Sequence, residues 1–255
     1  MTRIPAPMAG AGRARGGFAA AACLAAVAGG GQAAIAAPAD ARAGLVEVDL
    51  DSDIRYATRR NFTGRALPGY CEPKPLLLRS AARRLLAAHA ELGRTSGLGL
   101  KVFDAYRPVR ATRAMVRWAE RTGNRRLLDG GYIARRSNHN LGTTVDLTLV
   151  DVSREGHPEL DMGTRFDAFT PRSATLDATG TVLRNRLILK RAMEGHGFRN
   201  YAREWWHYDS RRPGPRPLDV PIGVSPRRSA GPRPPAGCRT AAPSRPPPPV
   251  RESGT

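Results

Sequence analysis

The residues that can form a hydrophobic core are confined to the middle of this 255-residue chain. Of its 22 prolines, 13 lie within 213–255, together with seven arginines and only two acidic residues. A segment of this composition buries too little apolar surface to offset the entropy lost on ordering. We therefore expect 223–255 to be a disordered Pro/Arg-rich tail and the folded domain to cover 45–222.

Residues 1–37 have the pattern of a secretory signal peptide. Three arginines and no acidic residue accompany a short apolar run, 18–28, and 34–37 offers a cleavage site of small residues. The run is too short to span a bilayer of about 30 Å, and we expect no transmembrane helix elsewhere. We therefore expect a secreted or extracytoplasmic protein. The alternatives are a disordered Ala/Gly-rich end and a lipoprotein anchored through Cys23, which most of the apolar run follows rather than precedes.

The chain is strongly basic, with 41 Lys and Arg residues against 22 Asp and Glu, a formal net charge of +19. The arginines are spread along the sequence rather than gathered into a stripe, as base-composition bias in a gene produces. A nucleic-acid groove requires clustered charge with interleaved aromatic residues, and only 6% of the residues are aromatic. We expect no nucleic-acid partner, but electrostatic association with an anionic cell wall.

The middle of the chain alternates between helical and strand periodicity. The spacing predicts helices over 75–92, 108–119 and 182–194, and strands over 98–103, 145–150 and 205–208. The elements follow no strict βαβ rhythm. We therefore expect a single α+β domain with a small central, mainly antiparallel sheet flanked by helices.

Two cysteines remain once the predicted signal peptide is removed, Cys71 and Cys238. In an exported protein they could form one disulfide. Cys238 lies in the predicted tail, so the sequence leaves the pairing open. Neither cysteine has the CxxC spacing of a zinc knuckle.

Two histidines come with acidic neighbours. His139 precedes Asp146 by seven residues, with Gly142 allowing a turn between them, and Glu204 precedes His207 by three. A carboxylate in the apolar strand predicted around Asp146 needs a partner, and a cation would supply it. Two imidazoles and one carboxylate leave a coordination position for water, as catalytic zinc requires, and a second carboxylate could take that water's proton. The alternative is two core histidines, with Asp146 paired to an arginine.

Glu204 and His207 would point to opposite faces of an ideal strand. If both serve one site, Glu204 must lie at the start of the strand, in a bulge or in a helical turn.

The segment 104–108 joins a predicted strand to a predicted helix, where side chains project from the end of a sheet. Arg107 could donate there to a developing oxyanion. Its alternative role is an ion pair with Asp104.

These motifs resemble the metal signature of the zinc D,D-peptidases related to the hedgehog signalling domain, in which Ser-x-His-x6-Asp is followed by Glu-x-x-His. More narrowly, the chain resembles the VanX-type D-alanyl-D-alanine dipeptidases. The likeness covers about 48–221 and includes the segments 53–58, 61–64, 104–108, 145–149, 162–167 and 204–208. The resemblance implies a hedgehog/D,D-peptidase-like fold and one Zn²⁺ per chain.

The resemblance also implies roles for single residues. His139, Asp146 and His207 would bind the zinc. Glu204 would be the general base that later returns the proton to the leaving amine, and Arg107 would stabilise the tetrahedral intermediate.

The substrate implied by the resemblance is a small dipeptide. Asp167 would contact its ammonium group, with Asp104 as a second contact, and Ser137 would help to hold it beside the metal. The implied reaction is zinc-dependent hydrolysis of D-alanyl-D-alanine to two D-alanines, outside the membrane, in wall turnover or salvage. The alternatives are a D,D-carboxypeptidase acting on wall stem peptides and a non-catalytic, zinc-containing wall-binding protein.

Overall fold

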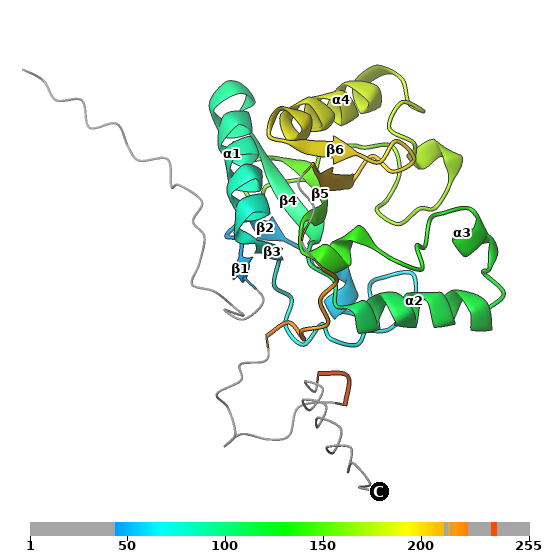
Figure 1. Ribbon diagram of the computed structural model, residues 1–255. Helices are drawn as coiled ribbons and strands as arrows, with labels where there is room; N and C mark the ends of the chain where they lie inside the picture. Colours follow the sequence, from blue (N-terminus) through cyan, green and yellow to red (C-terminus); the bar gives the residue numbers. More distant parts are fainter. Residues whose placement is uncertain (1–43, 212–213, 215, 224–235, 239–255) are drawn as a thin grey trace, which may run out of the picture. The chain divides into compact units, whose positions relative to one another are not determined.

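A five-stranded sheet lies at the centre of the part of the chain that the computed structural model describes, residues 44–211, 214, 216–223 and 236–238. β2 runs parallel to β4, and the other neighbouring pairs of this sheet are antiparallel. In order across the sheet, the strands are β2 (Asp51–Ser52), β4 (Leu98–Asp104), β5 (Thr144–Asp151), β7 (His207–Ser210) and β6 (Phe198–Asn200) (Figure 1). The predicted α+β domain with a mainly antiparallel sheet is confirmed. The predicted signal peptide and most of the predicted tail lie outside the described residues.

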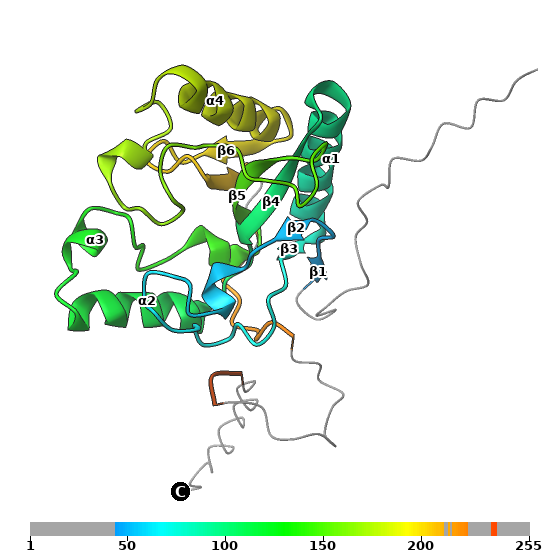
Figure 2. The ribbon, with the colours of Figure 1, turned by 180° about the vertical axis from the view of Figure 1, so that it is seen from behind.

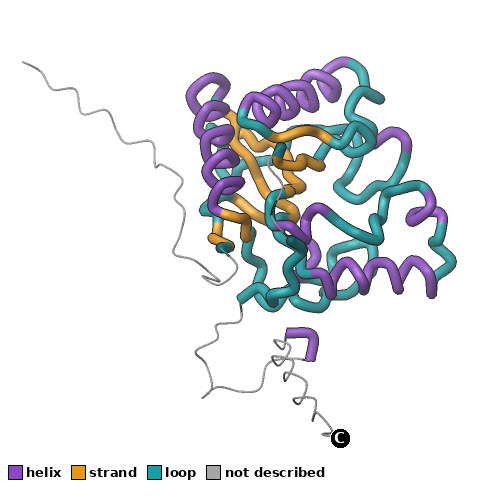
Figure 3. Tube along the Cα trace, viewed as in Figure 1, coloured by secondary structure: helices purple, strands orange, loops and turns teal. Residues whose placement is uncertain are grey.

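Two long helices, α1 (Arg79–Ser96) and α4 (Gly180–Gly195), pack against each other and against the sheet (Figure 1). The apolar residues of α1 recur three or four positions apart, so they share one face, and that face is buried against β4. α2 (Val109–Arg121) and the short α3 (Arg126–Asp129) follow β4 in the chain. Loops and short 3-10 helices make up much of the chain on the side away from α1 (Figure 3).

The first helix differs from the prediction at both ends. Residues 76–78 form β3 (Leu76–Leu78), which pairs antiparallel with β1 (Leu45–Glu47) beside α1 (Figure 2). The helix therefore begins at Arg79 rather than at residue 75. It continues past Gly93 and ends before Gly97, whose φ of 65° is the left-handed conformation that commonly terminates helices.

The two predicted central strands are confirmed, but β5 is buried more deeply than its alternating pattern indicates. Every residue from Thr144 to Val150 is buried, because β5 lies between β4 and β7 and is covered on both faces. Asp146 is therefore a carboxylate in the interior of the domain. The last predicted strand is shifted, since β7 begins at His207 rather than at residue 205.

The C-terminal segment packs back on the domain. Leu218 donates its backbone N–H to the carbonyl of Asn140, and Ile222 forms a bridge with Tyr70. Cys71 and Cys238 form a disulfide, with their Cα atoms 5.8 Å apart. The pairing that the sequence leaves open is therefore made, and it fixes residues 236–238 of the predicted tail to the domain.

None of the helices in the described part of the chain has both the length and the apolar composition needed to cross a bilayer.

Candidate active site

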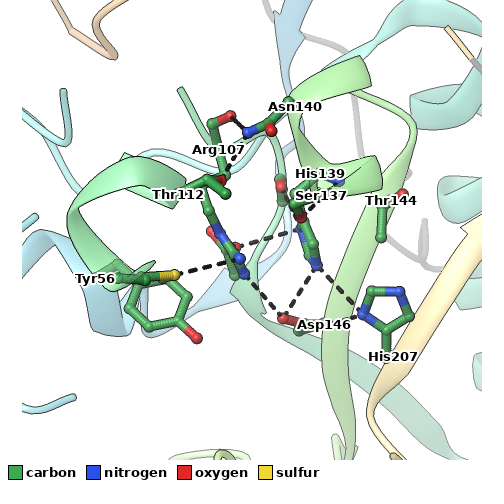
Figure 4. A network of polar contacts seen from close by, with 12 residues as sticks. Tyr56, Arg107, Thr112, Ser137, His139, Asn140, Thr144, Asp146 and His207 are labelled. Carbon is green, nitrogen blue, oxygen red and sulfur yellow. Dashed lines mark hydrogen bonds and ion pairs between the residues drawn. The ribbon is translucent and has the colours of Figure 1, made fainter. Parts of the chain in front are cut away.

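Three candidate metal ligands converge from two strands and a 3-10 helix. Asp146 on β5 and His207 on β7 are register partners, and His139 lies in η2 (Asn138–Leu141). Nε2 of His139 lies 3.3 Å from Oδ2 of Asp146 and 3.4 Å from Nδ1 of His207. The same Nδ1 is 3.0 Å from Oδ1 of Asp146, and the side chains point at one another in Figure 4.

The outer nitrogen of each imidazole is already occupied by an acceptor. Nδ1 of His139 lies 2.7 Å from the carbonyl oxygen of Ala105, and Nε2 of His207 lies 3.3 Å from Oδ1 of Asp209. Because a carbonyl and a carboxylate only accept, each outer nitrogen donates its proton to its partner, so the inner nitrogen can offer a lone pair to a metal ion. Two imidazole nitrogens and a carboxylate oxygen that converge on one point need positive charge between them, and the residues therefore fit a metal ion.

Positive charge at this centre also keeps Asp146 ionised. Burial would raise the pKa of Asp146, but the charge and the hydrogen bonds that the two imidazoles supply when protonated outweigh burial and hold that pKa below its usual value. Arg107 is a weaker partner, with Nη2 3.7 Å from Oδ2 of Asp146. The alternative of an Asp146–arginine pair is thus present as a long contact, beside the two histidines rather than in place of them.

A turn places Glu204 beside the three ligands. The N–H of His207 donates to the carbonyl of Glu204 at 3.3 Å, so residues 204–207 form a turn immediately before β7. Of the three conformations open to Glu204, the structure has a turn, and Glu204 lies three residues before β7 begins. The carboxylate is 7% exposed and lies 3.9 Å from Nδ1 of His207, and burial raises the pKa of Glu204 to about 7. A carboxylate with such a pKa is suited to take and return a proton near neutral pH.

Arg107 lies at the start of α2 with its guanidinium on the cavity wall. Its Nε and Nη2 donate to Oδ2 of Asp104 at 3.0 and 2.8 Å, and its guanidinium carbon lies 4.9 Å from the ring centroid of Tyr56. Asp104 is 0% exposed and lies outside the cavity lining. The contact of Asp104 with a substrate ammonium stays a prediction; in this structure the carboxylate is bonded to Arg107 instead.

Asp167 and Ser137 both line the cavity. Asp167 has a φ of 59°, uncommon for a non-glycine residue, and both of its carboxylate oxygens accept from the hydroxyl of Tyr56, at 3.1 and 2.9 Å. Burial, with Asp146 nearby, raises the pKa of Asp167 well above its usual value. The hydroxyl oxygen of Ser137 accepts from the N–H of His139 at 3.3 Å, so it caps the 3-10 helix that carries the histidine.

The cavity that these residues line has a volume of about 250 Å³. This is below the ~300–1,000 Å³ of sites for drug-sized ligands, so the cavity suits a small substrate. Aromatic side chains form much of its wall: Tyr56, Phe62, Tyr132, Phe169, Tyr201 and Trp206.

Sequence reasoning assigned no role to Tyr56 or Asp209. Tyr56 contacts Asp167, 111 residues further along the chain, and no spacing rule signals such a contact. Asp209 follows His207 by two positions on β7, and this strand spacing, which places both side chains on one face, could have found it.

Comparison with known proteins identifies the family. The profile of the peptidase M15 family, described as D-ala-D-ala dipeptidase, matches residues 41–219. The chain belongs to this family. Three relatives of this chain are D-alanyl-D-alanine dipeptidases. The one from Enterococcus faecium is 35% identical over 171 residues, that from Escherichia coli K12 36% over 172, and that from Streptomyces coelicolor 33% over 176. The matches cover 61%, 67% and 61% of this chain, and 83% of each relative.

As a member of the D-ala-D-ala dipeptidase family, the protein is an enzyme that hydrolyses a small dipeptide. The family consists of metallopeptidases, and His139, Asp146 and His207 form the group that can hold a metal ion among the residues described.

Proposed function

We propose that this protein is a zinc-dependent D-alanyl-D-alanine dipeptidase that acts outside the membrane. The observation that carries the proposal is the convergence of the three ligand side chains with Glu204 and Arg107 in one small cavity. The substrate is inferred from the named relatives, and the chemistry from the residues that line the cavity.

His139, Asp146 and His207 would hold the zinc, because two imidazoles and one carboxylate are a typical ligand set of catalytic zinc. When bound, zinc supplies positive charge that makes water more acidic and polarises the scissile carbonyl. The remaining catalytic work falls to the residues around the ligands.

Glu204 would accept the proton of the attacking water and deliver it to the leaving amine. Its burial beside His207 supports this role, since a buried carboxylate holds a proton more readily than an exposed one. Arg107 would donate to the developing oxyanion. Its guanidinium is oriented before the reaction by Asp104 on one edge and by the ring of Tyr56 beneath it.

Asp167 would bind the free ammonium group of the dipeptide. Asp167 lines the cavity, held by Tyr56, and an ammonium group would offset the negative charge of the neighbouring Asp146 and Glu204. A site that requires a free amino terminus next to the scissile bond favours a dipeptide over a long wall peptide. This distinguishes the proposal from a D,D-carboxypeptidase.

The proposed location rests on the signal-like residues 1–37 and on the disulfide. Disulfides persist in oxidising compartments outside the cytoplasm, so the Cys71–Cys238 bond supports export. Dipeptides released during wall turnover or taken up in salvage would then be the substrate pool. The net charge of +19 would favour association with an anionic cell wall.

The test is to incubate the purified, zinc-loaded protein with D-Ala-D-Ala, L-Ala-L-Ala, N-acetyl-D-Ala-D-Ala and a pentapeptide ending in D-Ala-D-Ala. We expect rapid hydrolysis of the free D,D-dipeptide alone. Equal cleavage of the pentapeptide would replace the proposal by the carboxypeptidase, and no cleavage of any substrate by zinc-loaded protein would leave the non-catalytic wall-binding protein.

A further inference from the structure

A buried tyrosine stands behind the Arg107–Asp104 ion pair. The hydroxyl of Tyr70 donates to Oδ1 of Asp104 at 2.5 Å. The other oxygen, Oδ2, accepts from both Nε and Nη2 of Arg107. The two oxygens of this carboxylate are therefore divided: Oδ1 accepts from the tyrosine, whereas Oδ2 accepts from the arginine and also lies 3.3 Å from Nδ1 of His139.

This division fixes the orientation of Asp104. The carboxylate is 0% exposed, so water cannot replace a lost donor at Oδ1. Without the hydroxyl of Tyr70, rotation of the carboxylate would allow Arg107 to satisfy both oxygens. The guanidinium of Arg107 would then no longer face the cavity.

Tyr70 itself acts from outside the cavity. It is 5% exposed and is absent from the cavity lining among the described residues. Its ring packs edge-on against the ring of Tyr56, with 6.0 Å between the centroids, and Tyr56 is the ring on which Arg107 stacks. Tyr70 thus contacts two of the groups that orient the guanidinium, Asp104 and Tyr56; Met115 and Asp146 also lie within 3.5 and 3.7 Å of its nitrogens.

The C-terminal segment holds Tyr70 in place. The N–H of Ile222 donates to the carbonyl of Gly69 at 2.8 Å, and the N–H of Cys71 donates to the carbonyl of Ile222 at 3.3 Å. Cys71 is also joined to Cys238. The residues on both sides of Tyr70 are therefore bonded to the C-terminal segment, which follows the catalytic motifs in the sequence.

We propose that Tyr70 is a positioning residue for Arg107: its hydroxyl fixes Asp104, and Asp104 aims the guanidinium at the oxyanion. The proposal rests on the proposed function, in which Arg107 stabilises the tetrahedral intermediate.

The test is Tyr70→Phe, which removes the hydroxyl and keeps the ring. We expect kcat for D-Ala-D-Ala to fall about tenfold or more with KM changed less than about twofold, because Arg107 acts on the transition state. Zinc content should be unchanged. The matched control is Tyr106→Phe, which removes a hydroxyl that bonds the backbone of Val220 on the same C-terminal segment, and it should keep kcat near the wild-type value.

A double-mutant cycle distinguishes positioning from a general loss of structure. In an Arg107→Ala background, Tyr70→Phe should change kcat by less than about twofold, because its target is gone. A loss of the same size in both backgrounds, or wild-type kcat in Tyr70→Phe alone, would overturn the proposal. If Tyr70→Phe does not fold, Asp104→Asn takes its place, and a zinc-loaded Asp104→Asn protein with normal kcat would equally overturn it.

A crystal structure of Tyr70→Phe tests the same step without turnover. We expect Arg107 to leave its wild-type position against Asp104, and an unmoved guanidinium would refute the proposal. Failure of the wild type to cleave D-Ala-D-Ala would instead refute the proposed function, and this structure would still decide the role of Tyr70.

Discussion

Asp146 and His207 face each other as register partners on β5 and β7, although 61 residues separate them in the sequence. Oδ1 of Asp146 lies 3.0 Å from Nδ1 of His207, with His139 completing the group from the 3-10 helix before β5. Neighbouring strands hold Asp146 and His207, so the sheet itself sets the positions of two of the three ligands. These two positions should survive mild perturbation of the surrounding loops.

Each histidine of the group should be required for zinc. We expect one zinc per chain in the wild type, and loss of most of it in His139→Ala and in His207→Ala, because two ligands hold a divalent ion poorly. Metal analysis of the purified proteins measures this, with His89→Ala as the control histidine in α1. Wild-type zinc content in both site variants would refute the ligand assignment.

Glu204 should be required for turnover but not for zinc. Glu204→Gln should retain the metal and lose activity by about 10²–10⁴-fold, the usual effect of removing a general base. Glu194→Gln is the matched control, since that carboxylate pairs with Lys190 at the end of α4. Near-normal kcat in a folded, zinc-loaded Glu204→Gln protein would exclude the proposed base.

Asp167 should select for a free amino terminus. An ionised carboxylate at the substrate ammonium is worth about 2–5 kcal/mol, much of it the penalty of leaving the buried charge unpaired. N-acetyl-D-Ala-D-Ala should therefore be a very poor substrate, and Asp167→Ala should narrow the ratio of kcat/KM between the free and acetylated dipeptides. Asp161→Ala, an exposed acid in the same loop, should leave the ratio unchanged. Equal hydrolysis of both dipeptides by the wild type would contradict this role.

Asp209 should strengthen metal binding through His207. It accepts from the outer nitrogen of that ring and is itself held by the hydroxyl of Thr144 at 2.8 Å. Removing such an outer partner typically weakens metal affinity by about 10–100-fold. We expect this loss for Asp209→Ala in a chelator competition, with Asp151→Ala on β5 as control. An unchanged zinc Kd would show that β7 alone orients the ring.

The disulfide should stabilise the domain. Loss of a native disulfide from a small secreted domain commonly costs about 2–5 kcal/mol, and this bond closes a loop of 167 residues. Cys71→Ser/Cys238→Ser should therefore unfold at a lower denaturant concentration than the wild type. A non-chelating phosphine reductant should lower the stability of the wild type to the same level and leave the double variant unchanged. If the double variant were as stable as the wild type without reductant, a structural role for the bond would be excluded.

Local periodicity determined much of the fold from the sequence alone. The strands around Leu100 and Leu147 and the helices that follow Pro108 and Gly180 were predictable, because the spacing of apolar residues within one element reflects which face is buried. The combination of His139, Asp146, Glu204 and His207 was also recognisable, since each pair is encoded within a few residues. The start of α1 was not predictable, because β3 exists only through its pairing with β1, about 30 residues earlier.

The tertiary structure decided which polar groups work together. The sequence left Glu204 without a definite backbone conformation, and a turn closed by His207 resolved it. It offered Asp104 as a substrate contact, and folding placed that carboxylate between Arg107 and Tyr70, outside the lining of the cavity. It left the two cysteines unassigned, although the fold brings their Cα atoms to 5.8 Å. Side-chain partners are set by long-range packing, and residue type and spacing describe only what lies within a few positions along the chain.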